Sequence, residues 1–253
     1  MSRILPRERH LVTGLALMGV SVLLTATLFP ESASANEAPS PPTIPETVYR
    51  VDTADKVAFI TIDDGIFTPE NALAYVTRHQ IPITAFLSAW TIKDSADYFT
   101  AMTRWGSVQA HSATHASFDL PATDLEHEIC YVQRRYSKKY GWHPWMLRTP
   151  YGVASDSRKV RAVAASCGVQ QIVMWDTVVD HGRVSFRGKK MQPGAIVLLH
   201  FSRDLKKDIH LAVKKIRAAG LVPANLADYL PDATPPTTPQ QLPGLQGPPF
   251  PGR

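Results

Sequence analysis

The chain has 253 residues, of which 44% are hydrophobic and 19% are charged, and its formal net charge is +5. The lysine and arginine residues are scattered and do not cluster on one predicted helix face, which argues against a nucleic-acid-binding protein. A mildly basic surface favours approach to acidic wall polymers or lipid headgroups only weakly.

The first 35 residues have the pattern of an export signal. Arg3, Arg7 and Arg9 precede an apolar run from residue 11 to 29, and small residues at 33–35 suit a signal peptidase. The run is also long enough to cross a bilayer uncut, so an uncleaved N-terminal anchor is the alternative. In both cases the following domain is expected outside the cytoplasm, secreted or attached to a membrane only through this segment.

Two Pro-rich stretches flank the centre of the chain. Residues 36–47 are predicted to be a linker and residues 231–253 a disordered tail, because neither stretch can build a core. Residues 48–230 have an ordinary length for one globular domain with a substantial core.

Strands and helices alternate through this central domain. Short apolar runs predict strands over 57–62, 83–87, 107–110, 145–147, 171–175 and 195–199. Amphipathic spacing and start signals predict helices over 69–79, 95–105, from about 125, 157–167 and 205–219. The alternation predicts a parallel sheet with helical crossovers. The domain is short for eight repeats, so we predict a reduced or irregular (β/α) barrel, with an open doubly wound sheet as the alternative.

Local signals give three finer expectations. Thr68 is predicted to cap the first helix with Pro69 at its first position, and Thr123 to Glu126 match a capping box. Cys130 and Cys167 could pair in an exported protein. Because Cys167 continues an apolar stripe at helical spacing, we expect a buried free thiol instead.

Two polar runs follow the ends of predicted strands. Asp63 and Asp64 would point to opposite faces of a continuing strand, so a shared site requires a turn, which Gly65 makes cheap. His111 and His115 can reach a common point. Two imidazoles and one carboxylate can hold a catalytic divalent ion with a position open for water. Read alone, Asp63 and Asp64 could also be a solvent-facing acidic turn, and His111 and His115 could be a pair of surface histidines.

These runs and two others resemble the motifs of the polysaccharide deacetylases of the NodB-homology type, carbohydrate esterase family 4. Residues 61–65 are similar to the family's first motif, Thr-Phe-Asp-Asp-Gly, and residues 111–115 to its second, His-Ser/Thr-x-x-His. Residues 148–152 match the third, Arg-x-Pro-Tyr-Gly, and residues 198–200 match the fifth, Leu-x-His.

The resemblance implies a metal site and a base. Asp64, His111 and His115 would be the ligands of a divalent metal, with Zn²⁺ the first choice and Co²⁺, Mn²⁺ or Ni²⁺ as alternatives. Asp63 would be the general base that takes a proton from the attacking water.

Three further roles follow from the same resemblance. Arg148 would keep Asp63 charged and oriented, the backbone N–H of Tyr151 would meet the developing oxyanion, and His200 would protonate the leaving group. Without the family context, Arg148 could equally be a structural ion-pair residue, Tyr151 a packed aromatic residue and His200 a core histidine.

The fourth motif departs from the family pattern. The family has an Asp-x-x-Asp-Trp run after a tryptophan, whereas residues 175–182 are shorter and lack the final tryptophan. Asp180 is the first candidate to orient His200, and Asp176 is the second. The missing tryptophan removes one expected aromatic wall of the sugar-binding groove.

The resemblance implies an exported metal-dependent hydrolase that removes N-acetyl groups, or else O-acetyl groups, from a polysaccharide such as peptidoglycan, a chitin-like polymer or acetylxylan. The altered fourth motif leaves a catalytically impaired glycan-binding protein as the alternative. An Fe(II) oxygenase ranks last, since such sites usually occur on antiparallel β scaffolds.

Overall fold

The structure is a computed structural model that describes residues 43–188, 190–230 and 232. These residues all belong to one compact unit, Pro41–Arg253. The predicted signal or anchor and most of the predicted linker and tail lie outside the described residues, so those assignments stay predictions. No helix in the described ranges is long and apolar enough to cross a membrane.

Ten strands form one sheet. They are β1 (Glu46–Val48), β2 (Val57–Asp64), β3 (Ile83–Leu87), β4 (Ser107–Ala110), β5 (Met146–Leu147), β6 (Gln171–Val173), β7 (Thr177–Asp180), β8 (Arg183–Phe186), β9 (Ala195–His200) and β10 (Val222–Pro223). Their order is β1-β6-β5-β4-β3-β2-β9-β7-β8, and β10 pairs with β2. The strands pair in parallel except in the β7–β8 hairpin.

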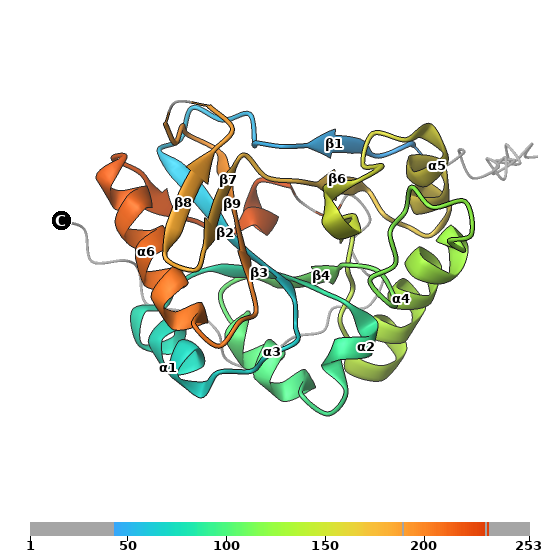
Figure 1. The fold of residues 1–253 in the computed structure, drawn as a ribbon, viewed down its shortest axis with the longest axis horizontal. Helices are drawn as coiled ribbons and strands as arrows, with labels where there is room; N and C mark the ends of the chain where they lie inside the picture. Colours follow the sequence, from blue (N-terminus) through green and yellow to red (C-terminus); the bar gives the residue numbers. More distant parts are fainter. Residues whose placement is uncertain (1–42, 189, 231, 233–253) are drawn as a thin grey trace, which may run out of the picture. The chain divides into compact units, whose positions relative to one another are not determined.

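The sheet winds in one direction, as a barrel does. Strands β2 to β6 are neighbours in sequence order, without the reversal that defines a doubly wound sheet. Near the start of the domain, β1 pairs with β6, and Arg50 then bridges Ala195 of β9. Figure 1 shows β1 across the open side of the curled sheet. The prediction of an irregular (β/α) barrel is therefore confirmed.

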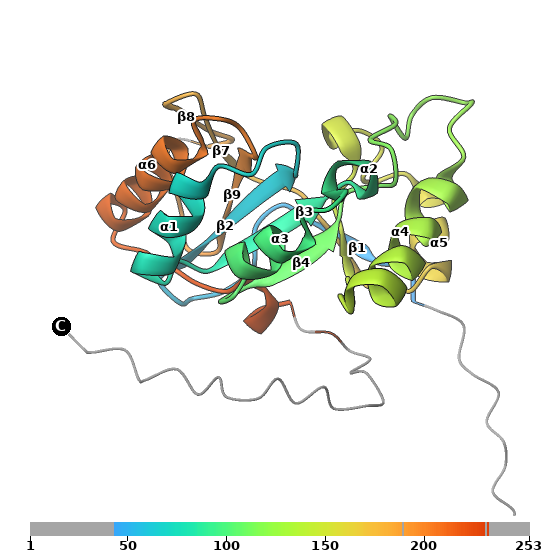
Figure 2. The same cartoon turned by 90° about the horizontal axis from the view of Figure 1, so that it is seen from below.

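Helices cover the outer face of the curl. They are α1 (Glu70–His79), α2 (Ala89–Ile92), α3 (Ala96–Met102), α4 (Leu125–Tyr140), α5 (Arg158–Ser166) and α6 (Leu205–Ala218), with 3-10 turns η1 (Pro150–Gly152) and η2 (Leu226–Asp228). Figure 2 shows α1 and α6 towards one end of the sheet, and α4 and α5 towards the other.

The two-residue period of β2 separates an outer and an inner core. Ile60 and Ile62 belong to the large apolar cluster shared with the helices. Phe59 belongs instead to a smaller cluster with Phe86 and Ile196 from the neighbouring strands. Asp63 shares the inward face of β2 with Phe59, since residues two and four apart on a strand point the same way. An apolar floor thus lies below the polar end of the strands.

Strands β1, β7, β8 and β10 were not predicted. The strand predicted over 145–147 contains β5, and the strand predicted over 171–175 contains β6, which ends at Val173, two residues early. The expected 95–105 helix is reduced to α3, and β1 begins at Glu46, inside the segment predicted as a linker.

Both predicted helix caps are wrong by one residue. Pro69, not Thr68, occupies the N-cap position of α1, because its backbone is still extended (ψ 114°). Asp124, not Thr123, caps α4, and its carboxylate accepts the His127 N–H at 3.0 Å. A carboxylate is an equally good cap, and the motif alone did not decide between the two neighbours.

The expectation of a free thiol is also wrong, because Cys130 and Cys167 form a disulfide. Cys130 lies on α4 and Cys167 follows α5, and the two helices pack against each other. The helical spacing identified the buried side of α5 but not the helix that it faces.

Removing this disulfide should destabilise the domain. The bridge closes a loop with a sequence separation of 37, and the double variant Cys130→Ser/Cys167→Ser should lose about 2–4 kcal/mol of unfolding free energy. Urea denaturation of the variant and the oxidised wild type measures the difference. Reduced wild type is the control and should match the variant. Equal stability of all three samples would contradict the structural role.

Candidate active site

A fully buried arginine lies at the centre of the curl. Arg148 follows β5, and its Nη1 atom donates to Asp63 Oδ1 at 2.7 Å and to Thr61 Oγ1 at 2.8 Å. Its Nε and Nη2 atoms donate to the main-chain carbonyls of Val173 and Met174 at 2.9 and 3.0 Å. Burial lowers the pKa of the Arg148 guanidinium, and the charge of Asp63 works against this. The arginine thereby joins β2 to the end of β6.

The end of β2 turns so that two successive carboxylates face the same space. Asp63 is only 3% exposed, and Asp64 has a positive φ of 79°, so the turn begins one residue before Gly65. Gly65 has φ 88°, and an added Cβ would lie 2.9 Å from Thr91 Oγ1. The sequence expectation of a turn at this glycine is confirmed, with Asp64 sharing the unusual backbone.

Both candidate ligand histidines lie in the loop that follows β4. His111 is buried, and its Nδ1 lies 2.9 Å from the Arg148 carbonyl oxygen, which leaves Nε2 facing the carboxylates. That Nε2 is 3.4 Å from Asp64 Oδ1 and 3.8 Å from Asp63 Oδ2. His115 has φ 67°, and its Nε2 is 3.2 Å from the same Asp64 oxygen.

This arrangement fits a divalent cation. One ligand atom each from Asp64, His111 and His115 lies within 4.8 Å of the others. Asp64 Oδ1 is buried and accepts no hydrogen bond within the described part of the chain. Burial would raise the pKa of Asp64, but its contacts with the two imidazoles outweigh that effect and hold the pKa well below its usual range. Two imidazole nitrogens and a carboxylate oxygen are a donor set that suits Zn²⁺ and similar ions.

Residues that the sequence did not single out hold the histidine loop. Ser88 Oγ donates to the His111 carbonyl at 2.7 Å. The buried carboxylate of Glu128 on α4 accepts the backbone N–H and the hydroxyl of Thr114 at 2.9 and 2.7 Å. In the sequence, the position of Glu128 as an acidic residue on the apolar face of an amphipathic helix could have identified it as a buried, hydrogen-bonded group.

Tyr151 lies beside the candidate ligands on the turn η1. Its φ is 59°, its side chain is 67% exposed, and its ring centroid is 4.6 Å from that of His115. The next residue, Gly152, also has a positive φ of 71°, and a Cβ there would lie 2.8 Å from the Trp175 ring. The exposed Tyr151 ring therefore lies beside the candidate ligand His115, and the Gly152 backbone next to it packs close to Trp175.

His200 is brought to the site by strand pairing, whereas its predicted partner is not. His200 is the register partner of Asp63 across the β2–β9 pair. Asp180 instead pairs with the neighbouring His181 at 2.9 Å, and Asp176 accepts a hydrogen bond from Thr177 at 3.0 Å. Neither carboxylate hydrogen-bonds His200 among the described residues, so an orienting role for Asp180 or Asp176 stays a prediction.

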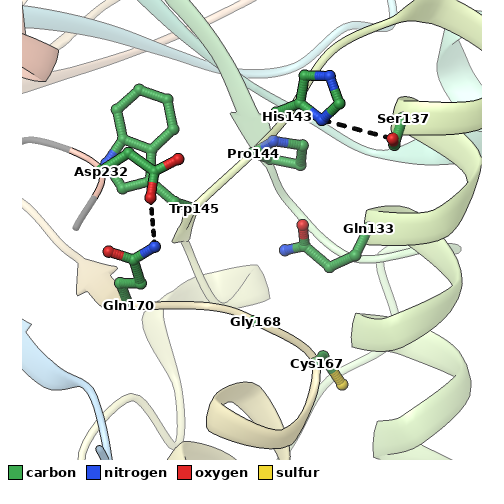
Figure 3. Close-up of a pocket in the computed structure, with 9 residues that line it drawn as sticks. All are labelled: Gln133, Ser137, His143, Pro144, Trp145, Cys167, Gly168, Gln170 and Asp232. Atoms are coloured by element: carbon green, nitrogen blue, oxygen red, sulfur yellow. Dashed lines mark hydrogen bonds between the residues drawn. The ribbon is translucent and has the colours of Figure 1, made fainter. Parts of the chain in front are cut away.

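A separate cavity of about 290 Å³ lies near α4 and the disulfide (Figure 3). It is lined by Trp145, His143 and Gln133, among others, and by none of the predicted catalytic or ligand residues. In Figure 3, Gln170 hydrogen-bonds Asp232, and His143 lies within hydrogen-bonding distance of Ser137. This cavity therefore has no place in the chemistry described above.

Comparison with known proteins supports the motif assignment. The polysaccharide deacetylase family model matches residues 50–172. An uncharacterised protein of Streptomyces coelicolor is 29% identical over 196 residues, covering 74% of this chain and 78% of that protein.

Solved structures of low sequence identity share the fold. A family 4 carbohydrate esterase pseudoenzyme from Bacillus anthracis is 20% identical, with a TM-score of 0.59, and the match covers 74% of this chain and 70% of that one. The chitin deacetylase of Colletotrichum lindemuthianum is 18% identical, with a TM-score of 0.61, and covers 76% and 94%. The family model thus supports the resemblance stated from the motifs, and these structures confirm the fold.

Replacing one partner of the buried ion pair should lower the unfolding free energy more than replacing both partners. Arg148→Met leaves the Asp63 carboxylate buried without its partner, so we expect the unfolding free energy to fall by about 3–5 kcal/mol. The double variant Arg148→Met/Asp63→Asn should recover part of that loss. Urea denaturation of both variants measures this, and identical losses in the two would argue against the pair. If Arg148→Met does not fold, recovery of folding in the double variant carries the same meaning.

Ligand substitution should remove tight zinc binding. Calorimetric titration of the metal-free protein should show one Zn²⁺ site in the wild type, weakened at least about a hundredfold by His115→Ala. His127→Ala is the matched control, since His127 is exposed on α4 and lies outside the ligand group. Equal affinities for the two variants would exclude His115 as a ligand.

Proposed function

We propose that this chain is a member of the polysaccharide deacetylase family and a metal-dependent hydrolase that removes acetyl groups from a polysaccharide. The observation that carries the proposal is the juxtaposition of a buried, arginine-bound carboxylate with a three-ligand group. Asp63 Oδ1 is bound by Arg148, and its other oxygen faces His111. A base and a set of ligands thus share one space.

The metal would be held by Asp64, His111 and His115. When bound, a divalent ion of this kind lowers the pKa of a water molecule and polarises the acetyl carbonyl. The identity of the ion is part of the proposal, with Zn²⁺ first and Co²⁺, Mn²⁺ or Ni²⁺ as alternatives.

The side chains supply the proton transfers. Asp63 accepts a proton from the attacking water, and Arg148 holds that carboxylate in place by a charge-assisted hydrogen bond. His200, on the adjacent strand, gives a proton to the departing nitrogen. The Tyr151 backbone N–H would meet the oxyanion. An amine is a poor leaving group unless it is protonated, so a separate acid favours N-acetyl over O-acetyl substrates.

The proposed substrate is a wall or extracellular glycan, either peptidoglycan, a chitin-like polymer or acetylxylan. The solved chitin deacetylase with the same fold makes acetylated sugars the natural class to test. The proposed location is outside the cytoplasm, secreted or attached through the N-terminal segment. The Cys130–Cys167 disulfide supports this, because such bonds persist in oxidising compartments.

A non-catalytic glycan-binding protein is the second candidate. Two observations favour it: Asp180 is engaged with His181 rather than His200, and one structure with this fold is a pseudoenzyme. Retention of Asp63, Arg148 and the ligand group favours turnover instead.

Acetate release separates the two candidates and tests the assigned roles. The zinc-loaded wild type should release acetate from chitin oligomers or peptidoglycan, and Asp63→Asn and His200→Ala should each reduce kcat by about 10²–10⁴-fold. Metal content should be unchanged in both variants, and His127→Ala should behave like the wild type. Glycan binding by the wild type without acetate release under any added metal would favour the second candidate.

A further inference from the structure

The loop that carries both candidate ligand histidines has an unusual backbone. Ser112 and His115 have positive φ values of 70° and 67°, although neither is a glycine. This conformation is uncommon for residues other than glycine and persists only when surrounding contacts enforce it. The position of His115 relative to His111 therefore depends on what holds the chain between them.

The first half of the loop is held by the end of β3 and the residues that follow it. The His111 N–H donates to the Leu87 carbonyl at 2.9 Å, and the His111 side chain is only 3% exposed. The backbone N–H groups of residues 89 and 90 donate to the carbonyls of residues 112 and 113, at 3.1 and 3.0 Å. Main-chain hydrogen bonds and burial thus fix this half.

The second half of the loop is less well held. Thr114 is exposed, and the His115 side chain is 22% exposed. Within the loop, Ser112 Oγ accepts the His115 N–H at 2.9 Å. Among the described residues, Glu128 on α4 is the only side chain from outside the loop that accepts a backbone hydrogen bond from Thr114 or His115. Its carboxylate binds both the N–H and the hydroxyl of Thr114, so α4 is the external support of this half.

Glu128 is buried although it is an acidic residue. It is 4% exposed and lies among the buried residues of α4, with Ile129 and Val132. No lysine, arginine or histidine in the described ranges lies within ion-pair distance of its carboxylate. Burying a carboxylate is costly unless hydrogen bonds compensate, and here both of its oxygens accept from Thr114. The contact with the ligand loop, and not an ion pair, therefore accounts for this buried charge.

We propose that Glu128 is a positioning residue for the candidate metal ligand His115. By fixing Thr114, it holds the unusual backbone in which the His115 imidazole faces Asp64, with Nε2 3.2 Å from Asp64 Oδ1. The inference rests on the proposed function and makes a helix outside the motifs part of its metal site. Loss of Glu128 should weaken metal binding through His115 and leave His111 in place.

Zinc affinity tests this role directly. Calorimetric titration of the metal-free protein with Zn²⁺ should show binding about 10–100-fold weaker in Glu128→Ala than in the wild type, the usual effect of losing a residue that supports a ligand. Glu126→Ala is the matched control, because Glu126 is exposed on the same helix, and it should bind like the wild type. Equal affinities for Glu128→Ala and Glu126→Ala would overturn the proposal.

The conservative variant separates the hydrogen bonds from the charge. Glu128→Gln keeps a carbonyl oxygen that can accept one of the two bonds from Thr114, so it should lose less zinc affinity than Glu128→Ala. Equal losses in both variants would assign the effect to the charge and overturn positioning by hydrogen bonds. If Glu128→Ala does not fold, weaker binding by Glu128→Gln than by Glu126→Gln supports the proposal, and equal binding overturns it.

A double-mutant cycle separates positioning from a general weakening of the site. If Glu128 acts through His115, Glu128→Ala/His115→Ala should bind zinc within about twofold of His115→Ala alone, because the ligand is already missing. A further loss of about 10–100-fold in the double variant would show that Glu128 acts by another route and would overturn the proposal.

Hydrogen exchange reports on the loop without metal or substrate. In the metal-free protein, the Thr114 amide should exchange at least about tenfold faster in Glu128→Ala than in Glu126→Ala, because a hydrogen bond to a charged group is lost. Equal exchange rates would contradict the positioning role. None of these measurements requires turnover, so a wild type that binds zinc but releases no acetate would refute the proposed hydrolase and still allow Glu128 to be tested.

Discussion

The buried Arg148–Asp63 pair is the constraint on which the site depends. A guanidinium taken fully out of water is tolerated only when its donors are satisfied, and here they reach the side chains of Asp63 and Thr61 and two main-chain carbonyls. The same interaction fills the polar layer above the apolar floor and fixes the carboxylate proposed as the base. Because His111 also contacts the Arg148 carbonyl, the arginine's backbone orients the candidate ligand as well.

The spacing of apolar residues along the chain predicted the strands and helices whose formation depends mainly on neighbouring residues. The run before Asp63 is apolar on both faces of the strand, so it could only be a buried strand, and polar residues at its end had to lie at the sheet's edge. The stripe that begins at Leu125 and includes Ile129 predicted α4 correctly, because helical periodicity is also local. The residues of the first three motifs therefore lie together, whereas Asp180 of the fourth motif pairs with His181.

The features that were missed or wrong depend on contacts distant in sequence. Cys130 and Cys167 each looked like a core residue, and only the packing of α4 on α5 decides that they pair. Glu128 supports the histidine loop through a contact that no motif records. The turn of the β7–β8 hairpin is held by Asp208 on α6, which is distant in sequence. From the sequence alone, residues 175–182 could be interpreted only as a shortened fourth motif.

The candidate catalytic residues and the β7–β8 hairpin lie in different parts of the sheet. The candidate ligands and base stand at the ends of parallel strands, where the inner core sets their positions and leaves little room for variation. The β7–β8 hairpin is antiparallel and stands at the end of the strand order, and none of its strand residues belongs to the apolar floor or to the buried ion pair. Because residues 177–182 of the fourth motif lie on this hairpin or its turn, the shortening of the motif leaves the Arg148–Asp63 pair and the three-residue ligand group in place.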